Sequence, residues 1–214
     1  MTTLIIVRHG QSMANLEDKF AGQTYNPPLS PLGHEQAEHT AEYIVSNYKV
    51  DAIYSSDLNR AFQTAEHIAG KLGAEIITEP GMREIYAGKW EGMKFDDIDS
   101  EYEEEFKLWK TNIGITGCLG GEKVSELADR VLSAITRIAE DNDGKAVVVA
   151  THATPIRALE TLWRKMSIVN MKNIPWVSNA SVTVAEYKDG EFALISVGED
   201  KHLGAMRTAL PENV

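Results

Sequence analysis

The 214-residue sequence contains a single cysteine, Cys118, which excludes an internal disulfide framework and leads us to expect a reducing compartment. It also lacks any apolar run long enough to span a bilayer. The apolar stretch near the start covers only four or five residues and has no positive flank or small-residue cleavage site, so it does not resemble a signal peptide. We therefore expect a cytoplasmic protein that has no membrane partner.

Positive charge is scarce as well: 21 basic residues stand against 32 acidic ones, for a formal net charge of −11. A nucleic-acid partner or an anionic membrane surface is therefore not expected. Repeats and low-complexity tracts are absent, and 43% hydrophobic residues are ordinary for a globular protein. The length favours one domain over residues 1–214, with residues 94–121 as a lid or specificity insertion.

Strand-like runs alternate with helical patterns along the chain. The expected strands are residues 3–9, 51–56, 74–79 and 144–152, and the expected helices are residues 29–48, 57–72, 124–140 and 153–166. The segment 180–198 has the pattern of a hairpin that turns at "KDG". This order predicts an α/β fold with a mostly parallel sheet, helices on both faces and the final hairpin at an edge.

Capping residues indicate where two of these helices start. Ser30 is a suitable N-cap for the first helix, because Pro31 follows it at the first helical position. Asp57 is the expected N-cap of the second helix. That assignment puts Arg60 in the first turn after the strand "DAIYSS".

Arginine and histidine residues follow three of the predicted strands. Arg8 and His9 end the first strand, Arg60 follows the second, and His152 ends "GKAVVVATH". Ligands of parallel sheets bind beyond the carboxyl ends of the strands, so these side chains should meet at one edge. An isolated Arg-His pair is more often structural, and Arg60 alone would suit a helix ion pair. Their joint occurrence at three junctions favours a site.

Two guanidinium groups and two imidazoles beside helix N-termini suit a dianion, most naturally a phosphoryl group. A neutral imidazole is a nucleophile that forms a phosphoramidate, and histidine titrates near neutral pH. The departing alkoxide needs a general acid, for which Glu84 in "MREIYAGKWEG" is the candidate. A carboxyl group keeps its proton more readily beside a phosphate dianion, and the same group can then activate water.

Four segments, "LIIVRHGQSMAN", "SSDLNRAFQTAEHI", "REIYAGKWEG" and "VVVATHATPIRAL", resemble the histidine phosphatase (phosphoglycerate mutase-like) superfamily in order and spacing. The resemblance implies a three-layer α/β/α sandwich, a mostly parallel sheet with an antiparallel edge strand, and chemistry without a metal or cofactor. It also implies that His9 is the phosphorylated nucleophile and Glu84 the proton donor. Arg8, Arg60 and His152 would form the phosphate pocket, and His152 would also be catalytic. Asn15 and Gly22 would be further substrate or phosphate contacts.

Three departures from the family pattern bear on the substrate. Asn26 in "NPPLS" stands where many members have Asp, and Lys123 in "GEK" replaces a capping-type Ser. After His152, where members often have Gly, the sequence continues with Ala153 and Thr154, which should narrow that side of the pocket.

The loop after Glu84 bears on whether water or a second substrate group accepts the phosphoryl group. Mutases of the family carry a "Y-G-x-L-x-G-x-N-K" segment there, whereas this sequence has "IYAGKWEGMKFDDID" and turns acidic. We therefore expect a phosphatase that acts on a small phosphorylated metabolite. The alternatives are phosphoglycerate mutase-type transfer and an inactive module that binds a phospholigand. The edge hairpin also allows a homodimer.

The segment 94–121 is expected to cover the site and set specificity. Its acidic side chains either disfavour highly anionic substrates or form an ordinary solvated helix face. Two tryptophans, Trp90 and Trp109, either line the pocket or belong to the core, and Trp163 is expected in the core.

Overall fold

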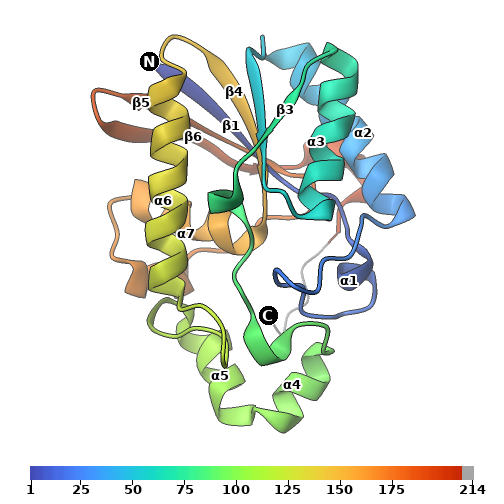
Figure 1. Ribbon diagram of the computed structural model, residues 1–214, viewed down its shortest axis with the longest axis vertical. Helices are drawn as coiled ribbons and strands as arrows, with labels where there is room; N and C mark the ends of the chain where they lie inside the picture. Colours follow the sequence, from blue (N-terminus) through green and yellow to red (C-terminus); the bar gives the residue numbers. More distant parts are fainter. Residues whose placement is uncertain (209–214) are drawn as a thin grey trace.

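The computed structural model describes residues 1–208, which form a six-stranded sheet covered by helices (Figure 1). The strands are β1 (Thr2–Arg8), β2 (Ala52–Ser55), β3 (Ile76–Thr78), β4 (Ala146–Thr151), β5 (Val182–Lys188) and β6 (Glu191–Glu199). Their order across the sheet is β3-β2-β4-β1-β5-β6. The first four strands are parallel, and the β5–β6 hairpin joins β1 in antiparallel pairing. The predicted sheet and its edge hairpin are confirmed.

Helices cover both faces of this sheet, with α2 (Pro31–Asn47) and α3 (Asn59–Leu72) on one and α6 (Val124–Asp141) and α7 (Ala153–Trp163) on the other (Figure 1). The alternation of side chains in β1 explains the two layers. Leu4 and Ile6 belong to the core cluster with α6 and α7, and Ile5 and Val7 belong to the cluster with α2 and α3. The three-layer α/β/α arrangement follows from these two buried faces.

The start of α3 differs from the prediction. The helix begins at Asn59, and its N-cap is Leu58, which makes no side-chain capping bond. The carboxylate of Asp57 instead accepts two hydrogen bonds from the guanidinium group of Arg83. The expected N-cap at Asp57 was therefore wrong, because an ion pair with the segment after β3 takes its side chain. Ser30 does cap α2, since its hydroxyl accepts the Gly33 N–H.

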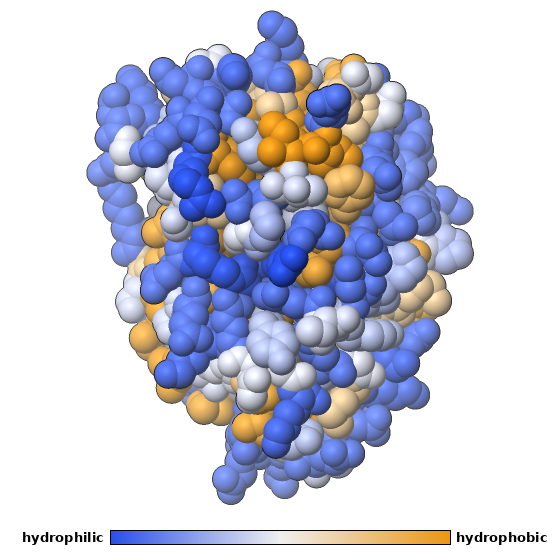
Figure 2. All heavy atoms as spheres, viewed as in Figure 1, coloured by the Kyte–Doolittle hydropathy of each residue, from blue (hydrophilic) through white to orange (hydrophobic). Residues whose placement is uncertain are grey.

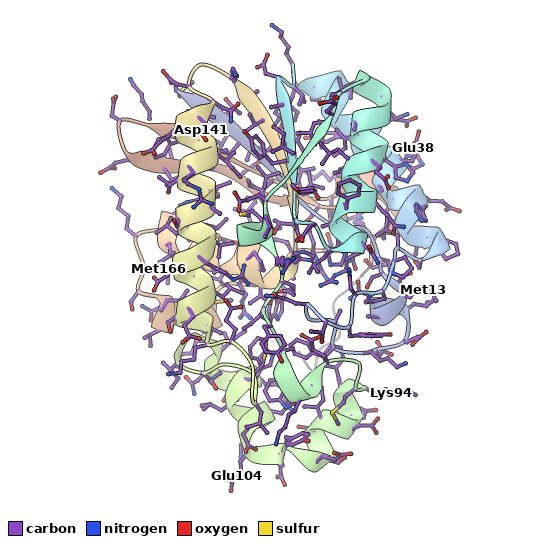
Figure 3. All side chains as sticks on the ribbon, in the orientation of Figure 1. Met13, Glu38, Lys94, Glu104, Asp141 and Met166 are labelled. Carbon is purple, nitrogen blue, oxygen red and sulfur yellow. The ribbon has the colours of Figure 1, made fainter. Side chains whose placement is uncertain are left out.

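The segment 94–121 contains two helices, α4 (Phe95–Glu101) and α5 (Glu103–Asn112), which extend the molecule beyond the sheet (Figure 1). The acidic side chains of these helices are exposed, and hydrophilic atoms predominate around this end of the surface (Figure 2). Glu104 lies at the far tip, away from the sheet (Figure 3). Phe106 and Trp109 are buried on the opposite side of α5. The acidic residues thus form a solvated outer face.

Short helices complete the described chain. These are α1 (Met13–Leu16) and the 3-10 helices η1 (Pro80–Met82), η2 (Gly88–Trp90), η3 (Ile113–Ile115), η4 (Ile168–Asn173) and η5 (Lys201–Met206). No helix within residues 1–208 is both long and apolar enough to cross a membrane. Trp163 is buried, as expected of a core residue.

Candidate active site

The carboxyl ends of the parallel strands open onto one cavity. It is lined by residues from several separate segments: Arg8, His9, Asn15, Lys19, Phe20, Ala21, Arg60, Glu84, Phe95, Trp109, Ala153, Thr154, Trp176 and Asn179. Five of the predicted site residues are in this set, and the His152 ring packs against that of His9. Gly22 is not among the lining residues. The convergence expected from the strand ends is therefore present in the structure.

His9 is held rigidly at the end of β1. Its backbone N–H donates to the Thr151 carbonyl at 3.0 Å, and its ring Nδ1 lies 2.6 Å from the Gly10 carbonyl oxygen. Because a carbonyl only accepts, Nδ1 carries the proton, and the neutral ring presents an unprotonated Nε2. Burial, then the charges of Arg60 and Arg8, lower the pKa of His9 well below its ordinary value. The ring is therefore neutral at physiological pH.

Gly10 is required for packing rather than for an unusual backbone angle, since its φ is not positive. A Cβ on Gly10 would meet the backbone carbonyl of Gly33 in the first turn of α2. The turn after His9 therefore passes directly over α2, and only a glycine fits at that crossing.

His152 packs edge-on against His9, with ring centroids 5.2 Å apart. Its Nε2 lies 2.8 Å from the hydroxyl of Ser56, and its Nδ1 is buried with no hydrogen-bond partner in the described chain. Burial, then the charge of Arg60, lower the pKa of His152 well below the ordinary value. The ring is neutral and has one polar atom left for a ligand.

The two arginines are almost fully buried, at 2% exposed for Arg8 and 1% for Arg60. Arg8 donates to the Val177 carbonyl, and Arg60 Nη2 donates to the Gly22 carbonyl at 3.0 Å. Arg8 Nε and Arg60 Nε and Nη1 are buried without partners among the described residues. Burial lowers the pKa of each guanidinium to about 10, so both stay charged at neutral pH. Buried unpaired donors of this kind are typical of an anion site.

Glu84 lines the cavity and is 7% exposed. Its Oε1 accepts the Ile85 N–H at 2.8 Å, and its own carbonyl accepts from Gln23 Nε2 and Arg130 Nη2, each at 2.9 Å. The side chain and the backbone of this residue are thus both held in place.

Sequence reasoning did not identify Arg130 as part of this support. Its guanidinium also donates to the carbonyls of Gly81 and Arg83, at 3.0 and 2.8 Å, and pairs with Glu122 at 2.6 Å. Arg130 therefore fixes the path of the chain from η1 to Glu84. Arg130 lies in an ordinary amphipathic helix, and the sequence pattern of that helix does not indicate this role.

Asn15 and Asn179 lie side by side in the cavity wall. Asn15 Oδ1 accepts from the Ser12 backbone N–H at 3.0 Å and from Asn179 Nδ2 at 3.2 Å, which leaves the Asn15 amide group for the cavity. Asn179 Nδ2 also donates to the His9 carbonyl at 3.1 Å. Asn179 was missed because it precedes a strand instead of following one.

Gly22 does not line the cavity but supports Arg60 through its carbonyl group. The Glu91 side chain packs against Gly22, and the sequence did not identify Glu91 as part of the site. The Glu91 carboxylate accepts the backbone N–H groups of Gln23, Thr24 and Tyr25 at 2.8, 2.7 and 2.7 Å. Burial raises the pKa of Glu91, but hydrogen bonds from the Thr24 hydroxyl and from backbone N–H groups outweigh it and the pKa is lowered overall. Glu91 thus stays ionised and fixes the loop whose carbonyl holds Arg60.

The three departures from the family pattern lie in the cavity wall and at the starts of two helices. Ala153 and Thr154 line the cavity, and the Asn26 side chain accepts the Asn59 N–H at 2.9 Å at the start of α3. Lys123 is the N-cap of α6, where its N–H donates to Glu126 at 2.9 Å. Of the two tryptophans left open, both are buried in the core, and Trp109 also borders the cavity.

Within residues 1–208, no group of three or more His, Cys, Asp or Glu side chains is arranged to hold a metal ion. The cavity donors are cationic or N–H groups, which suit an anion. A reaction without a metal stays a prediction.

Comparison with known proteins gives consistent matches over nearly the whole chain. The model of the histidine phosphatase superfamily (branch 1) matches residues 4–200. The chain is 34% identical to phosphoglycerate mutase-like protein 4 of Arabidopsis thaliana, covering 94% of this chain and 86% of that one. It is 30% identical to a metal-independent phosphoserine phosphatase of the same plant, covering 96% and 85%. The solved structure of Bacillus stearothermophilus YhfR superposes with a TM-score of 0.90 at 27% identity, covering 95% and 100%.

Proposed function

The chain belongs to the histidine phosphatase superfamily, and we propose that it hydrolyses phosphomonoesters of small metabolites through a phosphohistidine formed on His9. The observation that carries the proposal is a group of buried polar atoms without partners, the guanidinium donors of Arg8 and Arg60 and the Nδ1 of His152, next to the unprotonated Nε2 of His9. A phosphoryl group supplies the acceptors that these donors lack.

In the first step, His9 Nε2 attacks the phosphorus while the bond to the leaving oxygen breaks. The two guanidinium groups and the His152 Nδ1–H stabilise the negative charge on the three equatorial oxygens. Asn15 contributes a further donor through its amide group. Gly22 acts indirectly, because its carbonyl orients Arg60.

Glu84 gives its proton to the departing oxygen, so the alcohol leaves neutral. The resulting carboxylate then takes a proton from water, which attacks the phosphohistidine and releases inorganic phosphate. His9 returns to its neutral state and Glu84 to its protonated state. Every step uses side chains of this chain and needs no metal or cofactor.

Hydrolysis is favoured over mutase transfer by the lining of the cavity beyond the phosphate end. Apart from Arg8 and Arg60, the lining residues of the described chain include one cation, Lys19. A mutase must hold the substrate carboxylate while the substrate changes orientation, which requires more basic groups than this. The name of the phosphoserine phosphatase relative agrees with hydrolysis.

The test is phosphate release from para-nitrophenyl phosphate and from a panel of sugar phosphates, phosphoglycerates and phosphoamino acids, with chelator present. We expect release by the wild type and a loss of more than about 10³-fold in His9→Ala. Brief incubation with 32P-labelled substrate should leave acid-labile, alkali-stable label on the wild type alone.

Three results would contradict the proposal. Equal release by wild type and His9→Ala would remove the enzymatic role and favour a module that only binds phospholigands. Transfer between phosphoglycerate positions without release would favour the mutase alternative. Inactivation by chelator, reversed by added metal, would exclude the metal-independent mechanism.

A further inference from the structure

Beyond the phosphate end, the cavity wall is built mainly from aromatic side chains. The Phe20 ring packs against Phe95 and Trp109, with centroids 5.7 and 5.6 Å away. Trp176 adds a fourth ring, and the Arg157 guanidinium carbon lies 4.2 Å from its centroid. Phe20 and Trp109 are buried and support the wall, so a leaving group in this part of the cavity meets the half-buried rings of Phe95 and Trp176, which suit apolar or aromatic bodies.

Lys19 is the cation in this part of the wall. Its ammonium group lies 2.7 Å from Glu17 Oε2, and the two side chains are 29% and 40% exposed. The hydrogen bond to Glu17 raises the pKa of Lys19, so the ammonium group is charged at neutral pH. Glu17 is not a lining residue. A substrate carboxylate inside the cavity can therefore replace Glu17 as the partner of Lys19.

The charges of the cavity wall disfavour a cationic group on the substrate. Among the lining residues of the described chain, Glu84 is the one acid, and the proposed mechanism uses it as the proton donor. An ammonium group on the substrate would lie in a field set by Lys19, Arg8 and Arg60 without a carboxylate to pair with. Desolvation of an unpaired ammonium group is costly.

We propose that the preferred substrates are phosphomonoesters whose leaving group combines an apolar or aromatic body with a carboxylate and carries no ammonium group. The body packs on Phe95 and Trp176, the two half-buried rings of the wall, and the carboxylate pairs with Lys19 in place of Glu17. This substrate class rests on the proposed phosphatase activity, and it differs from phosphoserine by excluding the amino group.

Matched aryl phosphates test the charge preference on the full chain. The para-carboxyphenyl, para-carbamoylphenyl and para-aminomethylphenyl phosphates have similar shape and carry a negative, neutral or positive group. kcat/KM is measured for wild type, Lys19→Met, Glu17→Gln and Lys94→Met. Lys94 is the matched control, because it pairs with Lys19 through the backbone but is exposed, outside the cavity lining and at the outer surface (Figure 3).

For each variant, kcat/KM for one substrate is divided by kcat/KM for another, so a general loss of activity does not affect the ratio. The same ratio is then compared between variants, so differences in leaving-group reactivity do not affect the comparison. The carboxy-to-carbamoyl ratio should fall about fivefold in Lys19→Met, as for a partly exposed ion pair. It should rise in Glu17→Gln, where the competing carboxylate is gone, and stay at the wild-type value in Lys94→Met. The ratio of kcat/KM for the aminomethyl substrate to kcat/KM for the carbamoyl substrate should rise in Lys19→Met.

A second pair tests the exclusion of an ammonium group: phosphoserine and its analogue without the amino group. The wild type should hydrolyse the analogue with the higher kcat/KM. An unchanged carboxy-to-carbamoyl ratio in Lys19→Met, or a preference for phosphoserine, would overturn the substrate class while the phosphatase activity stands. Absence of release from every phosphate would overturn the phosphatase proposal, and this class with it.

Discussion

The Glu91 carboxylate lies against Gly22, in the space that a Cβ on that residue would fill. From there it accepts backbone N–H groups of the loop on one side and the Ala87 N–H, at 3.1 Å, on the other. Because the Gly22 carbonyl accepts from Arg60, this carboxylate connects the loop after Glu84 to the placement of the guanidinium group that we propose to bind phosphate. Glu91 is not among the residues that line the cavity, so we expect it to act as a positioning residue.

Glu91→Gln is therefore expected to lower kcat/KM by roughly 10- to 100-fold, because its amide group faces N–H donors and displaces the loop that holds Arg60. Unsatisfied groups in the loop should also lower the free energy of unfolding by about 1–3 kcal/mol. A displaced Arg60 weakens phosphate binding, so the inhibition constant of inorganic phosphate should rise. Steady-state kinetics and urea unfolding measure these effects.

Glu66→Gln provides the matched control, since Glu66 is exposed on α3. It should leave kcat/KM, the phosphate inhibition constant and stability at wild-type values. A Glu91→Gln variant that loses stability but keeps its phosphate inhibition constant would show that Glu91 supports the fold without positioning Arg60.

The Ser56 hydroxyl is expected to select the tautomer of His152. Its oxygen accepts the Leu58 N–H at 3.3 Å, so its own hydrogen is available for His152 Nε2 at 2.8 Å. That bond puts the ring proton of His152 on Nδ1, where it can donate to a phosphoryl oxygen. Ser56→Ala should lower kcat/KM by about tenfold, and 15N NMR of the imidazole should show a mixture of tautomers.

Ser56→Thr keeps the hydroxyl group and should restore both the Nδ1–H tautomer and most of the activity. If Ser56→Ala lowers activity while the spectrum still shows only the Nδ1–H form, Ser56 acts by another route and the tautomer argument is wrong.

The strand pattern predicted the cationic part of the site because Arg8, His9 and His152 are tied directly to strand ends. The sheet order then brings Arg60 beside them, since β4 lies between β1 and β2. Buried parallel strands leave little freedom in where their ends lie. The residues nearest to these ends were therefore the most predictable ones.

The rest of the cavity wall does not come from the carboxyl ends of the parallel strands, so the strand pattern could not predict it. β5 runs antiparallel to β1, so the chain reaches the site edge before this strand, which brings Trp176 and Asn179 into the cavity. Glu91 and Arg130 act on backbone groups of loops, and such contacts depend on turns that have no periodic pattern. Sequence periodicity therefore could not identify these four residues.

The stability of the protein should depend on pH through its two buried histidines. Burial and the charges of nearby groups lower the pKa of both His9 and His152 well below 6.5. As pH falls through 6.5, the unfolded chain takes up protons on these rings while the folded protein does not. The free energy of unfolding should therefore decrease below pH 6.5, by at most about 1.4 kcal/mol per pH unit for each histidine.

Urea unfolding from pH 7.5 down to pH 4.5, in phosphate-free buffer, measures this dependence. His9→Asn removes one of the two fully buried histidines, so the stability of this variant should fall less steeply below pH 6.5. His39→Asn is the control, because His39 is exposed and should keep the wild-type slope. Parallel curves for wild type and His9→Asn would mean that His9 has the same pKa folded and unfolded.

The assignment of Glu84 as proton donor predicts a dependence on the leaving group. An alkoxide needs a proton to depart, whereas para-nitrophenolate leaves without one. Glu84→Gln should therefore lower kcat/KM for an alkyl phosphate by about 10²- to 10³-fold, but by less than about tenfold for para-nitrophenyl phosphate. Because kcat/KM reports only the steps up to transfer onto His9, slow hydrolysis of the phosphohistidine does not obscure the comparison.

Arg130→Met extends this test to the support of Glu84. Arg130 Nη2 donates to the Glu84 carbonyl, and its loss should displace the carboxyl group without removing it. We again expect kcat/KM to fall more for the alkyl phosphate than for para-nitrophenyl phosphate. The loss for the alkyl ester should be smaller than in Glu84→Gln, about tenfold. Equal losses for both esters in Glu84→Gln would show that Glu84 binds or orients the phosphate, and the proton would then have to come from another group.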